Sequence, residues 1–192
     1  MPIDRERLIE HVAALAAGPR PAESVELESA RERVSGHLRE AGWEVDRHEF
    51  SVAFGDERLA GTNLVAHQPD RWTGTGPRLV VGAHLDSLPE TPGADDNASA
   101  VAVLLEIARV LPSQWPAEPQ LELELVAFDL EEHGMLGGAE HARLMHEQSV
   151  ELAGMVSLEM LGYCDQASNT QSLPRQLVGI YPDARHTPGR ST

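Results

Sequence analysis

Short apolar strands alternate with helices in the second half of the chain, and this alternation constrains the fold more than any other feature. Buried-strand patterns at 79–83, 121–128 and 152–158 are separated by helical patterns at 97–111 and 138–148. Strands joined through helices pair in parallel, and the helices cover the faces of the sheet. We therefore expect an α/β fold, a three-layer α/β/α sandwich with a mostly parallel mixed sheet.

The first half of the chain holds two helical patterns and then two strand patterns that meet at a Gly-Asp bend. These segments are 4–17, 23–41, 43–54 and 59–67. The end of the chain is different, because residues 182–192 have almost nothing to bury and are expected to be disordered. The expected organisation is one domain over residues 1–181.

Composition narrows the class of partner. The 15 basic residues stand against 31 acidic residues, a net charge of −16. This charge argues against nucleic acid, which needs a positive surface, and favours cations. No apolar run approaches the ~18 residues that cross a bilayer, and the N-terminus does not resemble a secretory signal. The single cysteine, Cys164, fits a reducing compartment, so we expect a cytoplasmic protein without a membrane segment.

Each predicted strand of the second half ends in polar side chains that can bind metal. The first is followed by His84 and Asp86, the second by residues 129–132, and the third by Glu159, while residues 95–97 open the intervening helix. Because parallel strands end at one edge of a sheet, these groups should gather there. Crowded carboxylates cost several kcal/mol unless a cation neutralises them. Imidazole and carboxylate ligands together favour zinc, with manganese or cobalt as alternatives.

Each of these groups also has a structural explanation when it is taken alone. A histidine at a strand end can simply be hydrogen-bonded, and Asp95, Asp96 and Asn97 can cap a helix. Their combination is harder to explain without metal. Glu131 and Glu132 are adjacent, so one carboxylate can bind metal while the other accepts a proton from water. Asp86 lies two residues from His84, on the same face, and can orient its ring.

At these residues the sequence resembles the zinc-dependent M28 peptidases of the bacterial leucyl-aminopeptidase type. The similarity covers roughly residues 78 to 163, and its motifs occur in the order of the family. The matching segments are VVGAHLDS (80–87), PGADDNASAVAVLLEIARVL (92–111), LVAFDLEEHGMLGG (125–138) and MVSLEMLGY (155–163).

The resemblance implies an aminopeptidase with two zinc ions that hydrolyses the first bond of a peptide with a free N-terminus. In the implied site, Asp96 bridges the two ions, and Glu131 is the general base while Asp86 orients a ligand. The resemblance also implies a cis peptide between Asp96 and Asn97. The implied metal ligands are His84, Asp96, Glu132 and Glu159.

The chain departs from the family after Glu159. The family's last metal ligand is a histidine far downstream, whereas this chain ends at residue 192 and its only later histidine, His186, lies in the expected disordered tail. We therefore expect the fold to be incomplete at its C-terminal end. The metal held by Glu132 should be weakly bound or absent, so one zinc or none is expected where the family has two.

Three functions stay open at this point. The first is a metallo-aminopeptidase, with activity reduced or lost in this chain. The second is a non-catalytic metal-binding or interaction domain on the same scaffold. The third is a single-zinc acyl transferase of the glutaminyl-cyclase type, which shares the fold; the Glu131–Glu132 pair fits the peptidases better. The sequence gives no indication of the oligomeric state.

Overall fold

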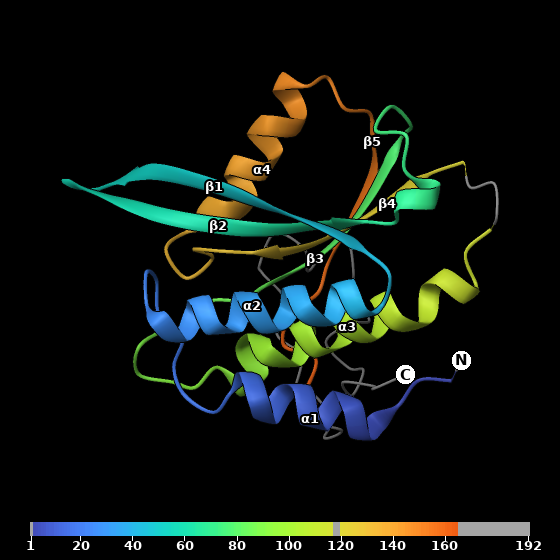
Figure 1. The fold of residues 1–192 in the computed structure, drawn as a ribbon. Coiled ribbons are helices and arrows are strands. Elements are labelled where there is room, and N and C mark those ends of the chain that lie inside the picture. The colour runs from blue at the N-terminus through green and yellow to red at the C-terminus, as the bar shows by residue number, and fades with distance from the viewer. Residues whose placement is uncertain (1, 117–119, 165–192) are drawn as a thin grey trace, which may run out of the picture.

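The computed structural model describes residues 2–116 and 120–164. Within them, five strands form one sheet in the order β1-β2-β4-β3-β5 (Figure 1). The predicted domain end at residue 181, the predicted tail at 182–192 and His186 lie outside the described residues. The strands are β1 (Glu44–Phe54), β2 (Glu57–His67), β3 (Arg78–His84), β4 (Glu122–Phe128) and β5 (Leu152–Ser157).

The sheet is mixed, as expected. β3 lies between β4 and β5 and is parallel to both. β1 and β2 form an antiparallel hairpin, and β2 joins the sheet by antiparallel pairing with β4. Among the described strands, only β2 therefore runs against the others. The register between β2 and β4 covers only residues 64–67 of β2, so most of the hairpin extends beyond the rest of the sheet.

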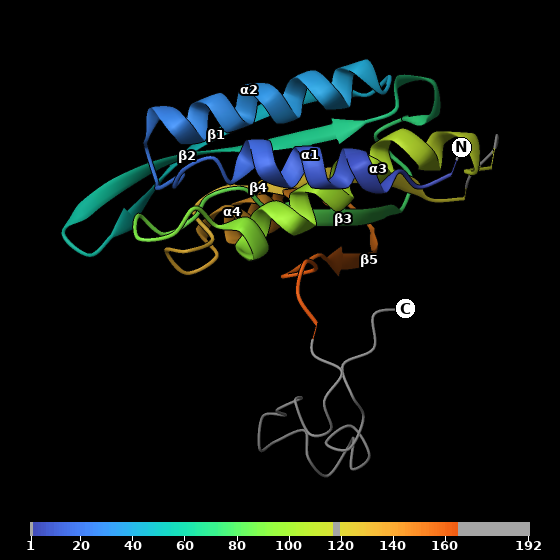
Figure 2. The same ribbon diagram turned by 90° about the horizontal axis from the view of Figure 1, so that it is seen from below.

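Helices cover both faces of the sheet. α1 (Arg5–Leu15), α2 (Val25–Glu40) and α3 (Ala100–Val110) lie on one side, and α4 (Leu136–Glu147) lies on the other (Figures 1 and 2). Neighbouring residues of β4 serve the two faces, because side chains alternate along a strand. Leu125 packs in the large core beneath α2 and α3, whereas Val126 packs with Met145 of α4. The three-layer arrangement predicted from the sequence is confirmed.

The ends of the helices follow local chemistry. Asp4 caps α1 by accepting from the backbone N–H of Glu6 and Arg7, and Ser24 caps α2 by accepting from that of Leu27. The helix predicted from residue 97 instead begins regularly at Ala100. No helix in the described part of the chain is long and apolar enough to cross a membrane.

β5 is an edge strand, and no described strand pairs with its outer side. Its apolar side chains Leu152, Met155 and Val156 are about half exposed, at 53%, 51% and 45%. β3, next to it, is almost completely buried. The predicted site lies beyond the carboxyl ends of these two strands and of β4.

Candidate metal centre

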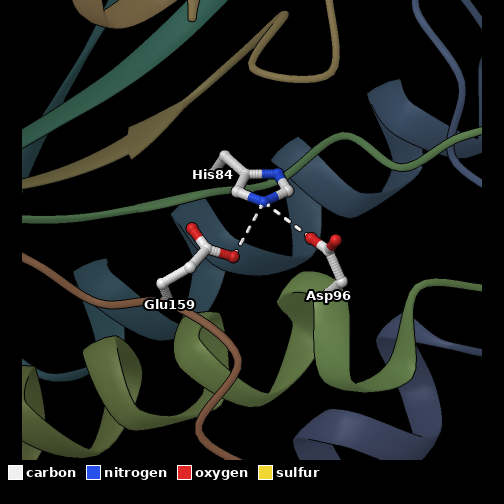
Figure 3. A group of neighbouring side chains, drawn as sticks. All are labelled: His84, Asp96 and Glu159. Carbon is white, nitrogen blue, oxygen red and sulfur yellow. Dashed lines mark ion pairs between the residues drawn. The ribbon is translucent and has the colours of Figure 1, made fainter. Parts of the chain in front are cut away.

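Three predicted ligands from three segments meet beside the sheet. His84 ends β3, Asp96 lies in the turn Ala94–Ser99 before α3, and Glu159 follows β5. His84 Nε2 is 2.9 Å from an oxygen of Asp96 and 3.4 Å from an oxygen of Glu159 (Figure 3). One ligand atom from each residue lies within 4.8 Å of the others. The spacing fits one ion held by one imidazole and two carboxylates.

Glu131 and Glu132 follow β4 and lie near this group. An oxygen of Glu131 is 3.9 Å from His84 Nε2. Glu132 is not one of the three residues whose ligand atoms cluster within 4.8 Å. Burial raises the pKa of Glu132, and the charge of Asp96 raises it further, so the two carboxylates interact electrostatically. Glu131 is thus the nearer of the pair to the imidazole.

Asp86 is fully buried and connects the imidazole with the loop after β4. Its two carboxylate oxygens each accept a hydrogen bond of 3.1 Å, one from the backbone N–H of Glu131 and one from that of Glu132. One of these oxygens lies 3.5 Å from His84 Nδ1, and the backbone oxygen of Asp86 lies 3.1 Å from the same nitrogen. The predicted contact between Asp86 and His84 is present. The hydrogen bonds from the backbone of Glu131 and Glu132 were not predicted from the sequence.

Asn97 holds Glu159 in place, a role that the sequence did not indicate. Its side-chain amide donates to a carboxylate oxygen of Glu159 at 3.2 Å and to the backbone oxygen of Leu158 at 3.1 Å. Its amide oxygen accepts from the backbone N–H of Met160 at 3.1 Å. The Asp96–Asn97 peptide is cis, as the resemblance implied. This cis peptide therefore joins the candidate ligand Asp96 to Asn97, which contacts the candidate ligand Glu159.

Two other carboxylates at this edge have protein partners instead. Asp129 is buried and accepts from the Arg31 guanidinium at 2.5 Å and from the backbone N–H of Thr62 at 2.7 Å. Asp95 accepts from the backbone N–H of Gly162 at 2.7 Å. The acidic segments by themselves do not separate these two residues from the candidate ligands. The resemblance to the M28 family did separate them, because its implied ligands are His84, Asp96, Glu132 and Glu159.

The electrostatics show an excess of negative charge around one imidazole. Burial lowers the pKa of His84, but the carboxylates of Asp86, Glu159 and Glu131 outweigh it and raise this pKa to about 9. Burial raises the pKa of Glu159, and the charge of Asp96 adds to the effect. A cation at this place would relieve the repulsion between carboxylates. The donor set, imidazole nitrogen with carboxylate oxygens, fits zinc.

Comparisons with known proteins identify the family of the chain. Residues 63–191 match the family described as Peptidase family M28. The Escherichia coli (strain K12) protein YfbL is 34% identical over 177 residues, which cover 86% of this chain and 52% of YfbL. The aminopeptidase YwaD of Bacillus subtilis (strain 168) is 40% identical over 85 residues, which cover 44% of this chain and 18% of YwaD. The chain thus spans about half or less of the length of these relatives.

Solved structures share the fold. A glutaminyl cyclase from Fimbriiglobus ruber superposes with a TM-score of 0.75 at 20% identity, over 95% of this chain and 69% of that one. A Zn-dependent exopeptidase from Parabacteroides distasonis gives 0.73 at 21% identity, over the same shares of 95% and 69%. Identities this low show a common architecture and do not separate the two activities.

Proposed function

Because the chain belongs to peptidase family M28, we propose that it acts as a zinc-dependent aminopeptidase. The observation that supports this most directly is the convergence of His84, Asp96 and Glu159, with ligand atoms within 4.8 Å of one another. The proposed substrate is a peptide with a free N-terminus, which a negatively charged site suits. The cytoplasmic location and the absence of nucleic-acid and membrane partners stay predictions from composition.

The proposed roles combine the geometry with what the resemblance to the M28 family implies. His84, Asp96 and Glu159 would hold one zinc ion. Asp96 and Glu132 would hold a second ion, which we expect to be weakly bound or absent in this chain. Bound zinc would polarise the scissile carbonyl and lower the pKa of water. Glu131 would accept the proton of the attacking water at its carboxylate and return it to the leaving amine.

Asp86 would hold His84, Glu131 and Glu132 in their relative positions. It contacts the imidazole through Nδ1 and fixes the backbone of Glu131 and Glu132, which leaves Nε2 of His84 directed at the carboxylates. Outer contacts of this kind orient ligands and raise their basicity. One buried carboxylate would therefore position His84, Glu131 and Glu132.

A second candidate is a single-zinc cyclase that converts an N-terminal glutamine into a pyroglutamyl ring with release of ammonia. The glutaminyl cyclase fold similarity and the single three-residue ligand cluster of the described residues favour it. The two reactions differ in their need for water and in the released product. A peptide with N-terminal glutamine distinguishes them, because cyclisation releases ammonia and hydrolysis releases free glutamine.

The test combines metal analysis with an aminopeptidase assay. Zinc-loaded protein should release amino acids from aminoacyl p-nitroanilides, and both a chelator and Glu131→Gln should abolish release. Glu131→Gln should keep its zinc, and the exposed control Glu147→Gln should keep full activity. Zinc binding without release of either product would instead indicate the non-catalytic metal-binding domain. Protein that binds no zinc would contradict the proposal altogether.

A further inference from the structure

Arg20 is a buried cation outside every motif that predicted the site. It lies between α1 and α2, and only 2% of the residue is exposed. Its guanidinium donates to four backbone carbonyl oxygens. Nε donates to Leu85 at 2.9 Å, Nη1 to Leu15 at 2.5 Å and Pro92 at 2.7 Å, and Nη2 to Gly93 at 3.2 Å. One side chain thus binds the end of α1 and both ends of the loop 85–93.

The main chain of Arg20 binds Ser87, the third residue of the same loop. Its N–H donates to Ser87 Oγ at 2.9 Å, and its carbonyl accepts from the N–H of Ser87 at 3.1 Å. A single residue therefore holds both ends of the loop and one further position within it. A guanidinium suits this role because its rigid fork of five donors can reach several carbonyls at once, whereas a lysine ammonium has three.

The carbonyl partners of Arg20 flank the candidate ligands. Leu85 follows His84 directly, and Gly93 precedes the turn that contains Asp96. The Gly93 carbonyl also accepts from the N–H of Ala98 at 3.0 Å, which connects Arg20 to that turn. The loop between these carbonyl partners connects His84 with the turn that contains Asp96.

Gly93 allows the close approach that this arrangement needs. Its φ is +61°, in the left-handed region that favours glycine, and an added Cβ would lie 2.5 Å from the Asp96 carbonyl oxygen and 3.0 Å from Arg20 Nη2. The guanidinium, the glycine and the turn therefore pack without space for a side chain. Burial lowers the pKa of Arg20, and the charge of the nearby Asp86 opposes this effect.

We propose that Arg20 is a positioning residue of the metal centre, and that it fixes the spacing of His84 and Asp96 by binding both ends of the loop between them. Arg20 touches neither ligand side chain and acts through the backbone. The inference rests on the proposed zinc binding at His84, Asp96 and Glu159. It predicts that Arg20 determines metal affinity and coordination geometry in addition to stability.

The test compares Arg20→Met and Arg20→Lys with Arg78→Met, a matched control. Arg78 is also buried, but it stands at the opposite end of β3 from His84. Zinc affinity is measured by competition with a chromogenic chelator, and geometry by the visible absorption of the Co²⁺-loaded protein. Arg20→Met should weaken zinc binding about 10- to 100-fold, as loss of outer contacts does, and change the cobalt spectrum. Arg20→Lys should recover part of both, and Arg78→Met should change neither.

Each contrary outcome has a defined meaning. A folded Arg20→Met protein with wild-type zinc affinity and cobalt spectrum would overturn the inference while leaving the proposed function intact. Failure of both Arg20 variants to fold, judged by circular dichroism, would overturn it in favour of a purely structural role. A wild-type protein that binds neither zinc nor cobalt would overturn the proposed function and the inference together.

Discussion

The two ends of strand β3 carry two ionic clusters that differ in how their charges are paired. At its start, Arg78 donates to buried Glu124 at 3.2 Å, and His141 Nε2 lies 2.9 Å from the other oxygen of that carboxylate. At its end, His84 faces several carboxylates, with Asp96 and Glu159 nearest. At the start of β3, the single carboxylate of Glu124 has two protein partners. At the end of β3, the carboxylates outnumber the one imidazole.

The contrast separates a structural cluster from a binding site. A buried ion pair that is complete needs no ligand, and removal of one partner is costly because it leaves an uncompensated charge. An acid-rich group at the open edge of a sheet is instead completed by a cation. Perturbed groups in such a place are candidates for function. The following predictions test this difference, from the largest expected effect to the smallest.

Removal of the imidazole should lower zinc affinity at the end of β3 and leave it unchanged at the start of β3. His84→Ala should weaken zinc binding by more than about 100-fold, because loss of a ligand should exceed the effect of losing an outer contact. His141→Ala, which removes the same group from the balanced cluster, should leave zinc affinity unchanged. Chelator competition measures both. Equal losses in the two variants would show that the clusters do not differ in metal binding.

Removal of the cation at the start of β3 should affect stability instead. Arg78→Met should lower the free energy of unfolding by about 3 kcal/mol, because Glu124 loses a buried partner. Urea denaturation monitored by circular dichroism measures this loss. The double variant Arg78→Met/Glu124→Leu should be more stable than Arg78→Met alone, since it removes the orphaned charge as well. A double variant that loses the sum of both single effects would contradict this explanation.

Zinc should stabilise the folded protein only by binding to the carboxylate-rich cluster at the end of β3. At about 100 times its dissociation constant, zinc should raise the free energy of unfolding by about 2.7 kcal/mol, since it binds the folded state. Thermal unfolding with and without zinc measures this as a higher midpoint. Asp96→Asn should abolish the shift, and Glu124→Gln should keep it. A shift that persists in Asp96→Asn would place the ion elsewhere.

The smallest effect is expected for a similar ionic group on the surface. Arg143 of α4 contacts Glu140 and Glu147, and the side chains of Arg143 and Glu147 are about half exposed, whereas those of Arg78 and Glu124 are buried. Because water and salt screen exposed pairs, Arg143→Met should leave the urea midpoint at the wild-type value. A loss as large as that of Arg78→Met would show that burial does not explain the difference between the ionic groups.

Much of the fold was predictable because its signals are local. Helical and strand periodicities indicated every α-helix and strand of the described residues to within a few positions. The helix predicted from residue 97 is the clearest difference, because Asp96 and Asn97 have non-helical backbone angles although their sequence continues a helical pattern. The place of the hairpin was not predictable. No local pattern indicates that β2 pairs with β4.

The site was predictable in outline and not in its internal order. The rule that parallel strands end at one edge indicated that His84 and the acidic groups would gather there. It could not show that Asp129 pairs with Arg31, which is 98 residues away in the chain. Nor could it show that Glu131, only two residues after Asp129, faces the imidazole of His84 instead. Nor did any pattern point to Asn97 or Arg20, whose roles depend on contacts with distant backbone.

By itself, the sequence determined the layers of the fold and the chemical types at the edge of the sheet, since periodicity and strand-end residues are properties of neighbouring positions. The tertiary structure decided which charges are paired and which remain for a cation. Pairing depends on partners from remote segments, such as Arg31 and Asp129, which are 98 residues apart. Their approach is fixed only when the chain has packed.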